Sequence, residues 1–582
     1  MIKFSKIAIF CLLCIISQHG FAQIKVTGKI VDDTGLFMTG VSILEQGTGN
    51  GAASGADGTY TITVKDASSI LQYSFLGFKT VTQTVGNQTS INITMEEVVS
   101  ELEGVVVTAI GLKENKDNLG YANTTVQGGV VSKAGEPTLL NGLSGKVSGV
   151  RISKTSGDPG AGSFIQIRGL SSITRDSQPL IVVDGVPISN DNRGDGGTGG
   201  VSNESRLNDI NPNDIENISV LKGASAAALW GTKALGGVIF ITTKKGDFNK
   251  KLSITYRASY SLDKISQKYP LQTAYGQGDN GVYNQAARDS WGDKISDRSG
   301  GLDEFNTSGS FFVGQDGVTY YPIVSKNSKT IYDDQYFNQA FQNGQFIENN
   351  LSLTAGNDNS RIYFSLSDLD QQGIIRKNSD YRRTTARVNA EYLLSPNVSI
   401  TANTTYSRTT SNRILKGASS SGFYLGLLRT PADFDQSGYR GDYYASSTSA
   451  PISNRHRSYR EPLGADNTAV YNNTLWTLNE QENQANTDRF MTNFTLSADP
   501  FDWLNLKARV GLDHYTEKKE EFFTPGSAAG AYSTGLFGTN IASNTIFNMD
   551  YIATATKTFN ENFNGSLLVG LNYNAKKLET SG

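Results

Sequence analysis

The chain has 582 residues, enough for several domains, and its formal net charge at pH 7 is −3. Only 37% of the residues are hydrophobic, while 61 glycines and 26 tyrosines accompany five methionines, a composition that favours strands and turns. After the N-terminal segment no stretch reaches the roughly 18 apolar residues of a membrane-spanning helix. Nothing in the sequence is basic enough to bind nucleic acid. These features exclude a helical membrane protein and a nucleic-acid-binding protein, but strands could still span a membrane.

Residues 1–22 predict a secretory signal peptide. Two lysines precede an apolar run at residues 7–16, and the small residue Ala22 stands just before the expected mature start at Gln23. The apolar run is too short for a membrane anchor. Both cysteines of the chain, Cys11 and Cys14, lie in this segment. We therefore expect an exported protein without disulfides or cysteine-bound metal.

Residues 23–97 predict a small β-sandwich, because apolar and polar residues alternate in four segments that glycine-rich turns separate. The residues expected to point inward are Val26, Gly28, Ile30, Tyr60, Ile62, Val64, Leu71, Tyr73, Phe75, Ile91, Ile93 and Met95. The stretches "GKIVDDTG", "ADGTYTI" and "LQYSFLGF" resemble the carboxypeptidase regulatory-like domain, a transthyretin-like β-sandwich. The resemblance implies a domain without catalytic residues.

The linker at residues 98–111 contains the stretch "EGVVVTAIG". Val105, Val106 and Val107 favour extended backbone. An extended segment can add a strand to the sheet edge of another protein through main-chain hydrogen bonds. We therefore interpret Glu103, Val105 to Val107 and Thr108 as a partner-binding strand; the alternative is that the valines form the first strand of the next domain.

Residues 112–246 predict a compact α+β domain. Residues 180–183 form a buried-strand pattern that ends at Asp184 and Gly185, and residues 215–220 return to strand. Asn213 or Asp214 is expected to cap a short helix, and residues 224–229 predict a helix of small residues. The glycine-rich stretch at residues 194–200 lacks the lysine and hydroxyl residue of a phosphate loop, so a flexible loop is favoured.

Catalytic and metal sites find little support in the sequence. After the signal peptide only His456 and His514 remain as histidines, so zinc sites and cysteine–histidine nucleophiles are nearly excluded. Asp184, Asp209, Asp214 and Glu216 could be considered as paired acids for glycoside cleavage. Carboxylates in turns are usually solvated or capping groups, however. We expect no catalytic residue, no metal and no cofactor.

The stretches "IQIRGL", "PLIVVDGVPI", "DIENISVLKG" and "GGVIFITTKKG" closely resemble the plug of SusC/RagA-family TonB-linked outer-membrane transporters of Bacteroidota. The resemblance runs from residue 23 to about residue 246 and continues more weakly beyond it. It marks as plug-motif residues Arg168, Gly169, Asp184, Gly185, Asp214, Glu216, Lys222 and Gly223. We expect the charged members of this set to form ion pairs within the plug or from the plug to the barrel; the alternative is that some of them are solvated.

The resemblance also implies the partners. The segment at Glu103, Val105, Val106, Val107 and Thr108 corresponds to the TonB box, so TonB of the TonB–ExbB–ExbD complex is the expected partner below the plug. A SusD-like lipoprotein is expected as a lid on the outer face. The barrel is expected to be surrounded by the lipid of the outer membrane.

Residues 247–582 predict part of a large antiparallel transmembrane β-barrel. In residues 386–392 apolar positions alternate with Arg387, Asn389 and Glu391, and residues 398–406 alternate in the same way after a tight turn. Further alternating segments are residues 252–260, 350–355, 362–369, 490–498, 504–512, 547–555 and 567–573. The long polar segments 263–345 and 410–487 are expected to be extracellular loops, opposite to short turns.

We count about nine or ten strands, against the 22 strands of plugged outer-membrane transporters. A plug of this size would not fit a ten-stranded barrel, so we expect the chain to be the N-terminal part of a longer protein. The fold class is thus mainly β: a sandwich, an α+β plug and part of a barrel.

We expect the protein to be a TonB-dependent importer of a nutrient, such as a glycan or peptide oligomer. A siderophore receptor or a signalling receptor of the same class is the first alternative; a surface adhesin or a secreted hydrolase is the alternative from another class. Ligand contacts stay open. Loop aromatics could stack on sugars, bind peptides or simply pack: Tyr320, Tyr321, Tyr424, Tyr443, Tyr444 and Trp476.

Overall fold

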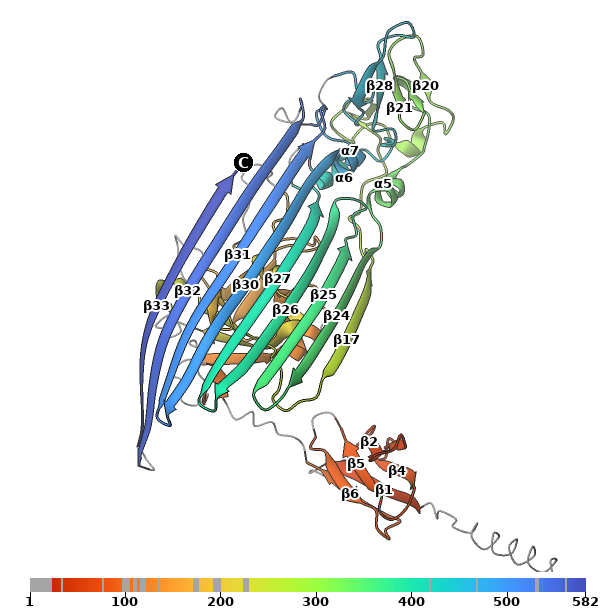
Figure 1. The fold of residues 1–582 in the computed structure, drawn as a ribbon. Helices are drawn as coiled ribbons and strands as arrows, with labels where there is room; N and C mark the ends of the chain where they lie inside the picture. The colour runs from red at the N-terminus through yellow and green to blue at the C-terminus, as the bar shows by residue number, and fades with distance from the viewer. Residues whose placement is uncertain are drawn as a thin grey trace, which may run out of the picture. The chain divides into compact units, whose positions relative to one another are not determined.

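The structure is a computed structural model, and it describes residues 24–32, 35–75, 78–96, 105–107, 113–115, 122–133, 135–170, 177–191, 200–222, 230–417, 420–466, 469–528, 533–560 and 563–582. The predicted signal peptide, Glu103, Thr108, Gly223, the predicted helix at residues 224–229 and the glycine-rich stretch at residues 194–199 lie outside the described residues. The chain divides into two compact units (Figure 1). One comprises Met1–Val105 with Glu114–Asp117, and the other comprises Val106–Lys113 with Asn118–Gly582.

The first unit is a β-sandwich. Its two sheets have the strand orders β4-β1-β7 and β3-β2-β5-β6, with the bounds β1 (Ile24–Asp32), β2 (Ser42–Glu45), β3 (Gly51–Ala53), β4 (Thr59–Val64), β5 (Ile70–Ser74), β6 (Val81–Thr84) and β7 (Ile93–Met95). All the apolar side chains that we expected to point inward are buried except Phe75, which is 36% exposed. Only glycine fits at position 28, because a Cβ atom there would lie 1.8 Å from the carbonyl oxygen of Ile91.

The valine segment forms a short strand. β8 (Val105–Val107) pairs with β9 (Lys113–Asn115) in a two-stranded sheet of their own. The five-stranded sheet of the following domain is built from other segments. In the structure the valines are therefore extended, as their β-propensity predicts, and they do not form the first strand of that larger sheet.

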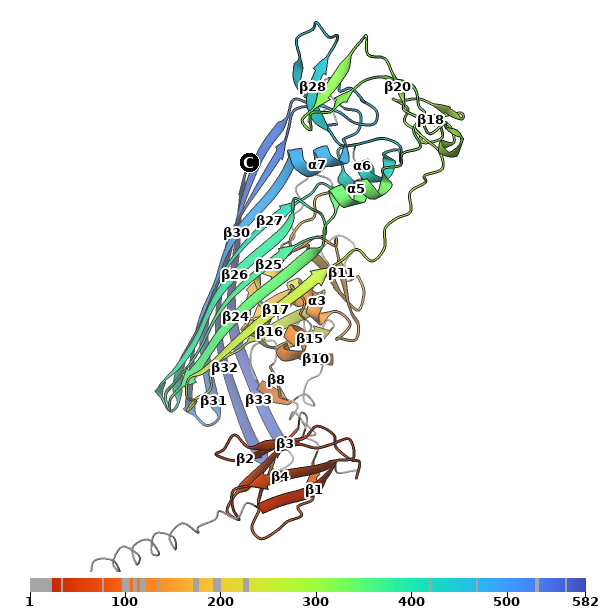
Figure 2. The same cartoon turned by 90° about the vertical axis from the view of Figure 1, so that its right-hand side faces the viewer.

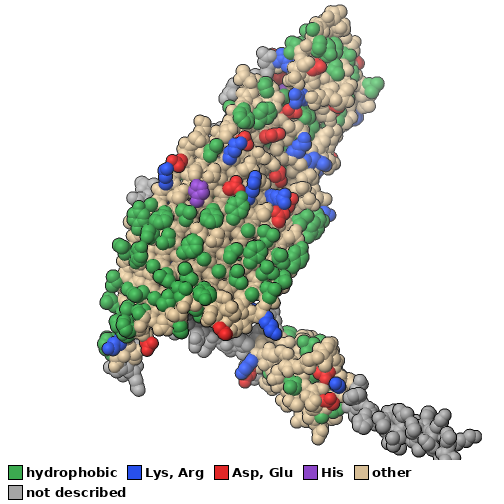
Figure 3. Space-filling view, in the orientation of Figure 1, with side chains coloured by type: hydrophobic (Ala, Val, Ile, Leu, Met, Phe, Trp, Pro, Cys, Tyr) green, Lys and Arg blue, Asp and Glu red, His purple; other side chains and the backbone are tan. Residues whose placement is uncertain are grey.

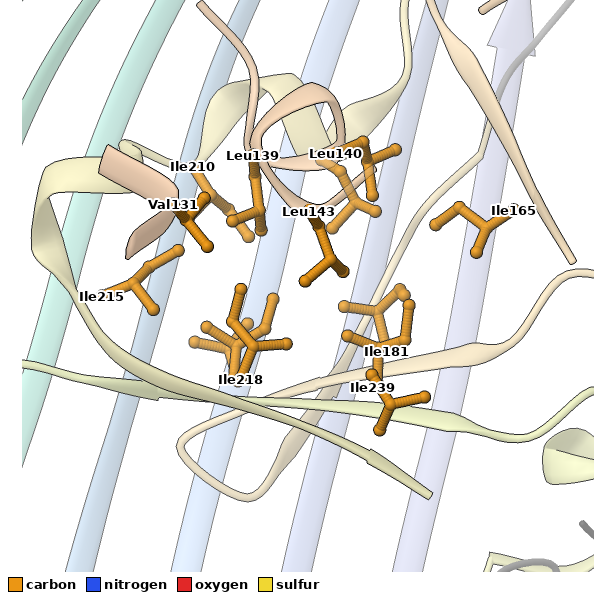
Figure 4. Close-up of a cluster of buried hydrophobic side chains, with 14 of the residues drawn as sticks. Val131, Leu139, Leu140, Leu143, Ile165, Ile181, Ile210, Ile215, Ile218 and Ile239 are labelled. Atoms are coloured by element: carbon orange, nitrogen blue, oxygen red, sulfur yellow. The ribbon is translucent and has the colours of Figure 1, made fainter. Parts of the chain in front are cut away.

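The second unit begins with the α+β domain that we call the plug. Its main sheet has the order β10-β15-β16-β13-β14, and β11 and β12 form a separate hairpin. The bounds are β10 (Ala122–Gln127), β11 (Val150–Lys154), β12 (Ser163–Ile167), β13 (Leu180–Val183), β14 (Val186–Ile188), β15 (Ile215–Lys222) and β16 (Val238–Thr243), with helices α2 (Gly128–Lys133) and α3 (Leu139–Leu143). Aliphatic side chains of the sheet, α2 and α3 pack together as an apolar core (Figure 4).

The strands predicted in the plug are present, but one cap was wrong. The predicted segment at residues 180–183 is β13, and the predicted segment at residues 215–220 lies within β15. A short 3₁₀ helix, η3 (Pro212–Asp214), precedes β15, and its capping side chain is that of Asn211, which accepts a hydrogen bond from the backbone of Asn213. Pro212 occupies the first position of the turn, so the capping residue must come directly before it.

A nine-stranded antiparallel sheet forms the rest of the unit. Its order is β17-β24-β25-β26-β27-β30-β31-β32-β33, so β17 and β33 are its edge strands. The bounds are β17 (Ser253–Asp263), β24 (Gly344–Gly356), β25 (Ser360–Gln372), β26 (Ser379–Ser395), β27 (Val398–Arg413), β30 (Gln481–Phe501), β31 (Leu504–Phe523), β32 (Leu536–Asn560) and β33 (Phe563–Ser581). Each contains all or most of one strand that the alternation predicted. The sheet is curved, and the plug lies on its concave side (Figure 2).

The two faces of this sheet differ as predicted. Arg387 and Asn389 of β26 are buried against the plug, whereas Val388 and Tyr392 between and beyond them are exposed on the outer face. Hydrophobic side chains gather in a band over the lower part of the outer face (Figure 3). The strands extend well past this band, since β32 has 25 residues whereas about 9–11 suffice to cross a membrane. Apolar alternation therefore identifies only the part of each strand that contributes to this apolar band.

Long loops connect the strands at one end of the sheet and tight turns connect them at the other. The predicted loops 263–345 and 410–487 correspond to the segments between β17 and β24 and between β27 and β30. They contain helices α5 (Asp333–Ala340), α6 (Phe423–Arg429) and α7 (Thr474–Glu480). A sheet of order β22-β21-β28-β29 combines both loops, with the bounds β21 (Phe311–Gly314), β22 (Thr319–Tyr320), β28 (Arg440–Tyr444) and β29 (Ile452–His456). Among the described residues, no helix is both long enough and apolar enough to cross a membrane.

Candidate functional site

The interface between the plug and the concave face of the strand sheet is the candidate functional site. The β13–β14 hairpin reaches it through a two-residue turn at Asp184 and Gly185, whose φ angles are 48° and 85°. Positive φ at both central residues is the geometry of a type I′ turn, for which Asp-Gly is a favoured pair. The Asp184 carboxylate accepts hydrogen bonds from the backbone N–H of Thr243 at 2.9 Å and from its hydroxyl at 2.7 Å. It also forms an ion pair at 2.7 Å with Arg387 of β26.

The tip of this turn lies directly against another strand. Arg509 of β31 forms an ion pair at 2.8 Å with Asp550 of β32, and its guanidinium donates a hydrogen bond to the carbonyl oxygen of Asp184 at 3.3 Å. A Cβ atom at Gly185 would lie 1.6 Å from the Nη1 atom of Arg509. Glycine is therefore required twice, for the positive φ and for the close approach of the arginine.

A larger set of buried charges joins the plug segment at residues 200–210 to the strands. We call it the interface charge network; its members are Glu204, Arg206 and Asp209 of the plug and Arg413, Arg489, Asp513 and Glu517 of β27, β30 and β31. No side chain in the network is more than 8% exposed. Charges buried to this extent must be paired and hydrogen-bonded, because an isolated buried charge is strongly unfavourable.

Arg489 is the centre of this network. It binds Asp513 with two hydrogen bonds of 2.8 Å, and its Nη1 atom lies 3.1 Å from the carboxylate of Asp209. It also donates to the carbonyl oxygens of Arg206 at 2.6 Å and Ser189 at 2.9 Å. One strand arginine thus binds two separate plug segments, and its fork of donors is nearly fully used.

Glu204 forms the second half of the network. Its carboxylate accepts a hydrogen bond from Arg206 at 2.8 Å and another from the hydroxyl of Ser411, and it lies 3.2 Å from the Nη2 atom of Arg413. Burial opposes its ionisation, but the positive charges of Arg413 and Arg206 outweigh burial and hold the pKa of Glu204 below its ordinary value. Glu204 therefore stays ionised inside the interface.

Strands β24 to β26 also contact the plug through hydrogen bonds, in addition to the ion pair between Arg387 and Asp184. The hydroxyl of Tyr363 donates to Asp214 at 2.9 Å, and Arg383 donates to the carbonyl oxygens of Asn208 at 3.0 Å and Ile210 at 3.3 Å. Arg383 also forms an ion pair with Glu348 of β24, at a distance of 3.3 Å between its Nη2 atom and the carboxylate. The plug is thus held by directional polar contacts on several strands.

The plug-motif residues make different kinds of contact. Asp184 forms the ion pair that we expected from plug to barrel. Asp214 makes a hydrogen bond instead, and the Nζ atom of Lys222 donates to the hydroxyl of Thr124 at 2.8 Å. Within the described residues neither of them has an ion pair, and neither do Arg168 and Glu216, whose side chains are exposed. For these four the ion-pair expectation therefore stays a prediction, with solvation of the exposed Arg168 and Glu216 as the alternative.

Gly169 follows Arg168 in an exposed turn, where its φ of 112° suits glycine. Three of the acids considered for glycoside cleavage, Asp184, Asp209 and Asp214, bind residues of the strand sheet instead. Within the described ranges no group of three or more histidine, cysteine, aspartate or glutamate side chains could hold a metal ion.

Most aromatic residues that we considered for ligand stacking are used for packing. Trp476 is fully buried: its ring stacks on His456 at 4.1 Å, and its Nε1 atom donates to the hydroxyl of Ser527 at 3.0 Å. Burial lowers the pKa of His456 to about 3, so this histidine is neutral. Tyr444 stacks on Phe311 at 4.6 Å. Of the alternatives for Trp476, the structure therefore supports packing.

The fold and the site together define a class of protein, a β-barrel wall with a plug domain held on its inner face. A sequence model of the TonB-dependent receptor plug domain matches residues 115–238, and a model of the carboxypeptidase regulatory-like domain matches residues 26–107, a range that includes β8.

The chain is 32% identical over 375 residues to the TonB-dependent receptor SusC of Bacteroides thetaiotaomicron, covering 64% of this chain and 33% of that protein. It is 28% identical to the TonB-dependent receptor P3 of Formosa agariphila, covering 99% of this chain and 50% of the other. A solved structure of the RagAB peptide importer in the open-open state has the same fold, with a TM-score of 0.59, 22% identity and coverage of 82% of this chain and 49% of that one. The chain thus resembles TonB-dependent receptors of the SusC/RagA family, and it spans about a third to a half of the length of these curated relatives.

Proposed function

We propose that the chain is part of a TonB-dependent transporter that imports a nutrient, a glycan or peptide oligomer, across the outer membrane of a Gram-negative bacterium of the Bacteroidota type. The observation that carries the proposal is a folded plug held on the inner face of the strand sheet by ion pairs and hydrogen bonds, such as Asp184 to Arg387 and Asp209 to Arg489. Polar contacts of this kind can be exchanged for contacts with water, so the plug can move without losing its own core.

In this proposal TonB of the TonB–ExbB–ExbD complex binds the segment at Glu103, Val105 to Val107 and Thr108 from the periplasm, where the sandwich also lies. β8 is already extended, and within the described part of the chain it pairs with β9 alone. Strand addition by TonB would use the free edge of β8 or replace β9. Outer-membrane lipid surrounds the apolar band, and a SusD-like lipoprotein covers the loop end.

No covalent chemistry is required of this chain, and we propose that it is not an enzyme. Binding of the nutrient above the plug, followed by a pull on the β8 segment, would loosen the interface and open a path along the strands. Import of a siderophore, or signalling, would use the same parts and differ in the ligand.

The test is the substitution Val106→Pro in the complete protein in its native host. Proline removes a backbone donor and cannot pair as an inner strand residue, so uptake should be lost while the protein still reaches the outer membrane and binds its ligand. Val106→Ala keeps the backbone donor and serves as the matched control. Growth on the cognate nutrient and surface binding of that nutrient are measured together. Normal growth of the proline variant would refute the TonB-box assignment, and loss of binding as well as growth would indicate a structural strand.

A further inference from the structure

Two loop arginines lie over a stacked pair of tyrosines. The rings of Tyr459 and Tyr471 are 6.0 Å apart and nearly parallel. The guanidinium carbon of Arg429 lies 4.7 Å from the centre of the Tyr471 ring, and that of Arg460 lies 5.9 Å from the same centre. We call these four residues the arginine–tyrosine cluster.

The cluster is built on a rigid support from both long loops. The buried side-chain amide of Gln277 donates to the carbonyl oxygens of Tyr459 at 2.7 Å and Ala287 at 2.9 Å. Its backbone N–H donates to Asp433 at 3.0 Å, and Asp433 in turn forms an ion pair with Arg298 at 2.7 Å. The position of Tyr459 is therefore fixed by buried hydrogen bonds, and a site on it would be preorganised.

The cluster has positive charge without a matching partner. Arg429 is exposed and Arg460 is partly exposed, and neither forms an ion pair with any residue that the structure describes. The third arginine of this region, Arg288, is neutralised by Asp289 at 3.1 Å. Free guanidinium groups side by side are a common means of binding carboxylates.

The nearby acids Glu461 and Asp466 do not cancel this charge fully at neutral pH. Burial and the neighbouring charge of Asp466 raise the pKa of Glu461 to about 7, so this carboxyl group is only partly ionised at neutral pH. The two acids therefore carry less than two full negative charges, and positive charge remains around Arg429 and Arg460.

A second, independent observation is an unused buried hydroxyl. Tyr459 is 1% exposed, and its hydroxyl has no hydrogen-bond partner among the described residues. Leaving a buried polar group unsatisfied costs about 1–3 kcal/mol. Burial raises the pKa of Tyr459 to about 12, while the charges of Arg429 and Arg460 act in the opposite direction, so both guanidinium groups lie within electrostatic range of this hydroxyl. The two arginines and the hydroxyl converge on one region.

This region belongs to the loops over the plug. Arg429 is the last residue of α6, which stands at the loop end of the sheet, above the plug in Figure 2. Lys416, shortly before α6, forms an ion pair with Asp158 of the plug. A molecule bound at α6 would thus lie on the side from which cargo would reach the plug.

We propose that Arg429, Arg460 and the hydroxyl of Tyr459 form a subsite for a carboxylate group of the imported molecule. The inference rests on the import function proposed above and narrows its cargo to acidic oligomers. A carboxylate has two oxygens with four lone pairs, which suit two guanidinium forks and one hydroxyl donor. The carrier of the carboxylate can be an acidic peptide or a uronic-acid oligosaccharide, and the experiment separates them.

The test is a binding measurement on the complete protein purified from outer membranes. Two pairs of fluorescent probes are used: a glutamate-rich pentapeptide with its glutamine counterpart, and oligogalacturonate with its methyl ester. The wild type should bind at least one acidic probe more tightly than its neutral counterpart. The double variant Arg429→Gln, Arg460→Gln should bind that acidic probe roughly a hundredfold more weakly, about tenfold for each arginine. Binding of the neutral counterpart should not change.

Two further variants keep the test decisive. Arg376→Gln removes one exposed positive charge from the loop end, where the side chain only donates to the carbonyl oxygen of Asn338, and should leave binding unchanged. Tyr459→Phe keeps the ring stack and removes the hydroxyl, so it should weaken acidic binding by a smaller factor. Equal binding of acidic and neutral probes by the wild type would overturn the proposal. So would unchanged binding by the double variant, or an equal loss for both members of a probe pair.

The result of the binding test does not depend on the result of the import test. The Val106→Pro variant should retain acidic-probe binding with wild-type affinity while uptake is lost. If that variant imports normally, the TonB-box assignment fails and the carboxylate subsite is still judged by binding alone.

Discussion

The plug is held together and held in place by different kinds of contact. Its interior is a cluster of aliphatic side chains, such as Leu140, Ile218 and Ile239, that are at most 1% exposed. Its contacts with the strands include ion pairs and hydrogen bonds, with Arg489 and Arg387 as strand partners, and Met491 of β30 also packs with the aliphatic cluster. The contrast predicts a plug whose core persists when its polar contacts with the strands are lost.

The energetic contributions of the plug core and of its interface with the strands also differ. Full burial of one large aliphatic side chain contributes about 1.5–3 kcal/mol, and this term does not depend on orientation. A complete buried ion pair contributes little net stability, because desolvation offsets the attraction, whereas removing one partner costs about 3–5 kcal/mol. The interface contacts therefore determine the position of the plug, but they add little net free energy to keep it there.

The largest effect is expected for Arg489→Ala. The substitution leaves the carboxylates of Asp209 and Asp513 buried without their shared partner, which should destabilise plug seating by about 3–5 kcal/mol. The urea concentration at which the plug becomes accessible to protease should fall. The control Arg382→Ala removes an exposed arginine that lies 3.2 Å from Asp368, where about 0–1 kcal/mol is expected. Equal effects of the two variants would contradict the role of the network.

A similar or slightly smaller effect is expected for Ile239→Ala in the plug core. The cavity should cost about 2–5 kcal/mol of plug stability. Because Ile239 is not a member of the interface charge network, the effects of Ile239→Ala and Arg489→Ala on unfolding should add within roughly 0.5 kcal/mol. A coupling well above that value in a double-mutant cycle would show that core and interface are one cooperative unit.

Parts of this arrangement follow directly from the sequence. The turn at Asp184 and Gly185 is local, because an Asp-Gly pair between two apolar runs defines its own backbone geometry. Alternation in residues 386–392 likewise identified the inner face that bears Arg387 and Asn389. Such signals depend on neighbouring residues only.

The interface charge network could not be predicted in this way. Arg489 and Asp209 are 280 positions apart, and nothing near either residue identifies the other. The cluster of charged residues around Glu204 and Arg206 resembles a solvated loop in sequence. The burial of Trp476 could not be predicted for the same reason, since it depends on His456 and Ser527 in other segments.

A moderate effect is expected for Gly185→Ala. Alanine at a φ of 85° costs about 1–2 kcal/mol in backbone strain, and its Cβ atom would displace the guanidinium of Arg509. Gly169→Ala is the matched control, because Gly169 also has positive φ but has no other atom within 4 Å of the added Cβ. Protease accessibility of the plug in urea should change more for Gly185→Ala. Equal changes would mean that the close approach of Arg509 contributes nothing.

The smallest effect concerns a buried carboxylate without a cation, Glu45 of the sandwich. Hydrogen bonds from Asn50 at 2.9 Å and Ser69 at 2.6 Å hold its pKa below the ordinary value. A lowered folded-state pKa stabilises the sandwich above the unfolded-state pKa of about 4.3, and this contribution is lost as pH falls through the folded-state pKa. Thermal unfolding of residues 23–97 should show a falling midpoint at acidic pH, and Glu45→Gln should reduce that slope. An unchanged slope would contradict the assignment.

The central claim is that the plug leaves its seat without losing its core. Hydrogen–deuterium exchange of the membrane-embedded protein across a urea series tests it most directly. The backbone amide of Ser189, which donates to Asp513 of β31 across the interface, should exchange at lower urea than amides in the middle of β15. Simultaneous exchange of the Ser189 amide and the β15 amides at every urea concentration would contradict the account.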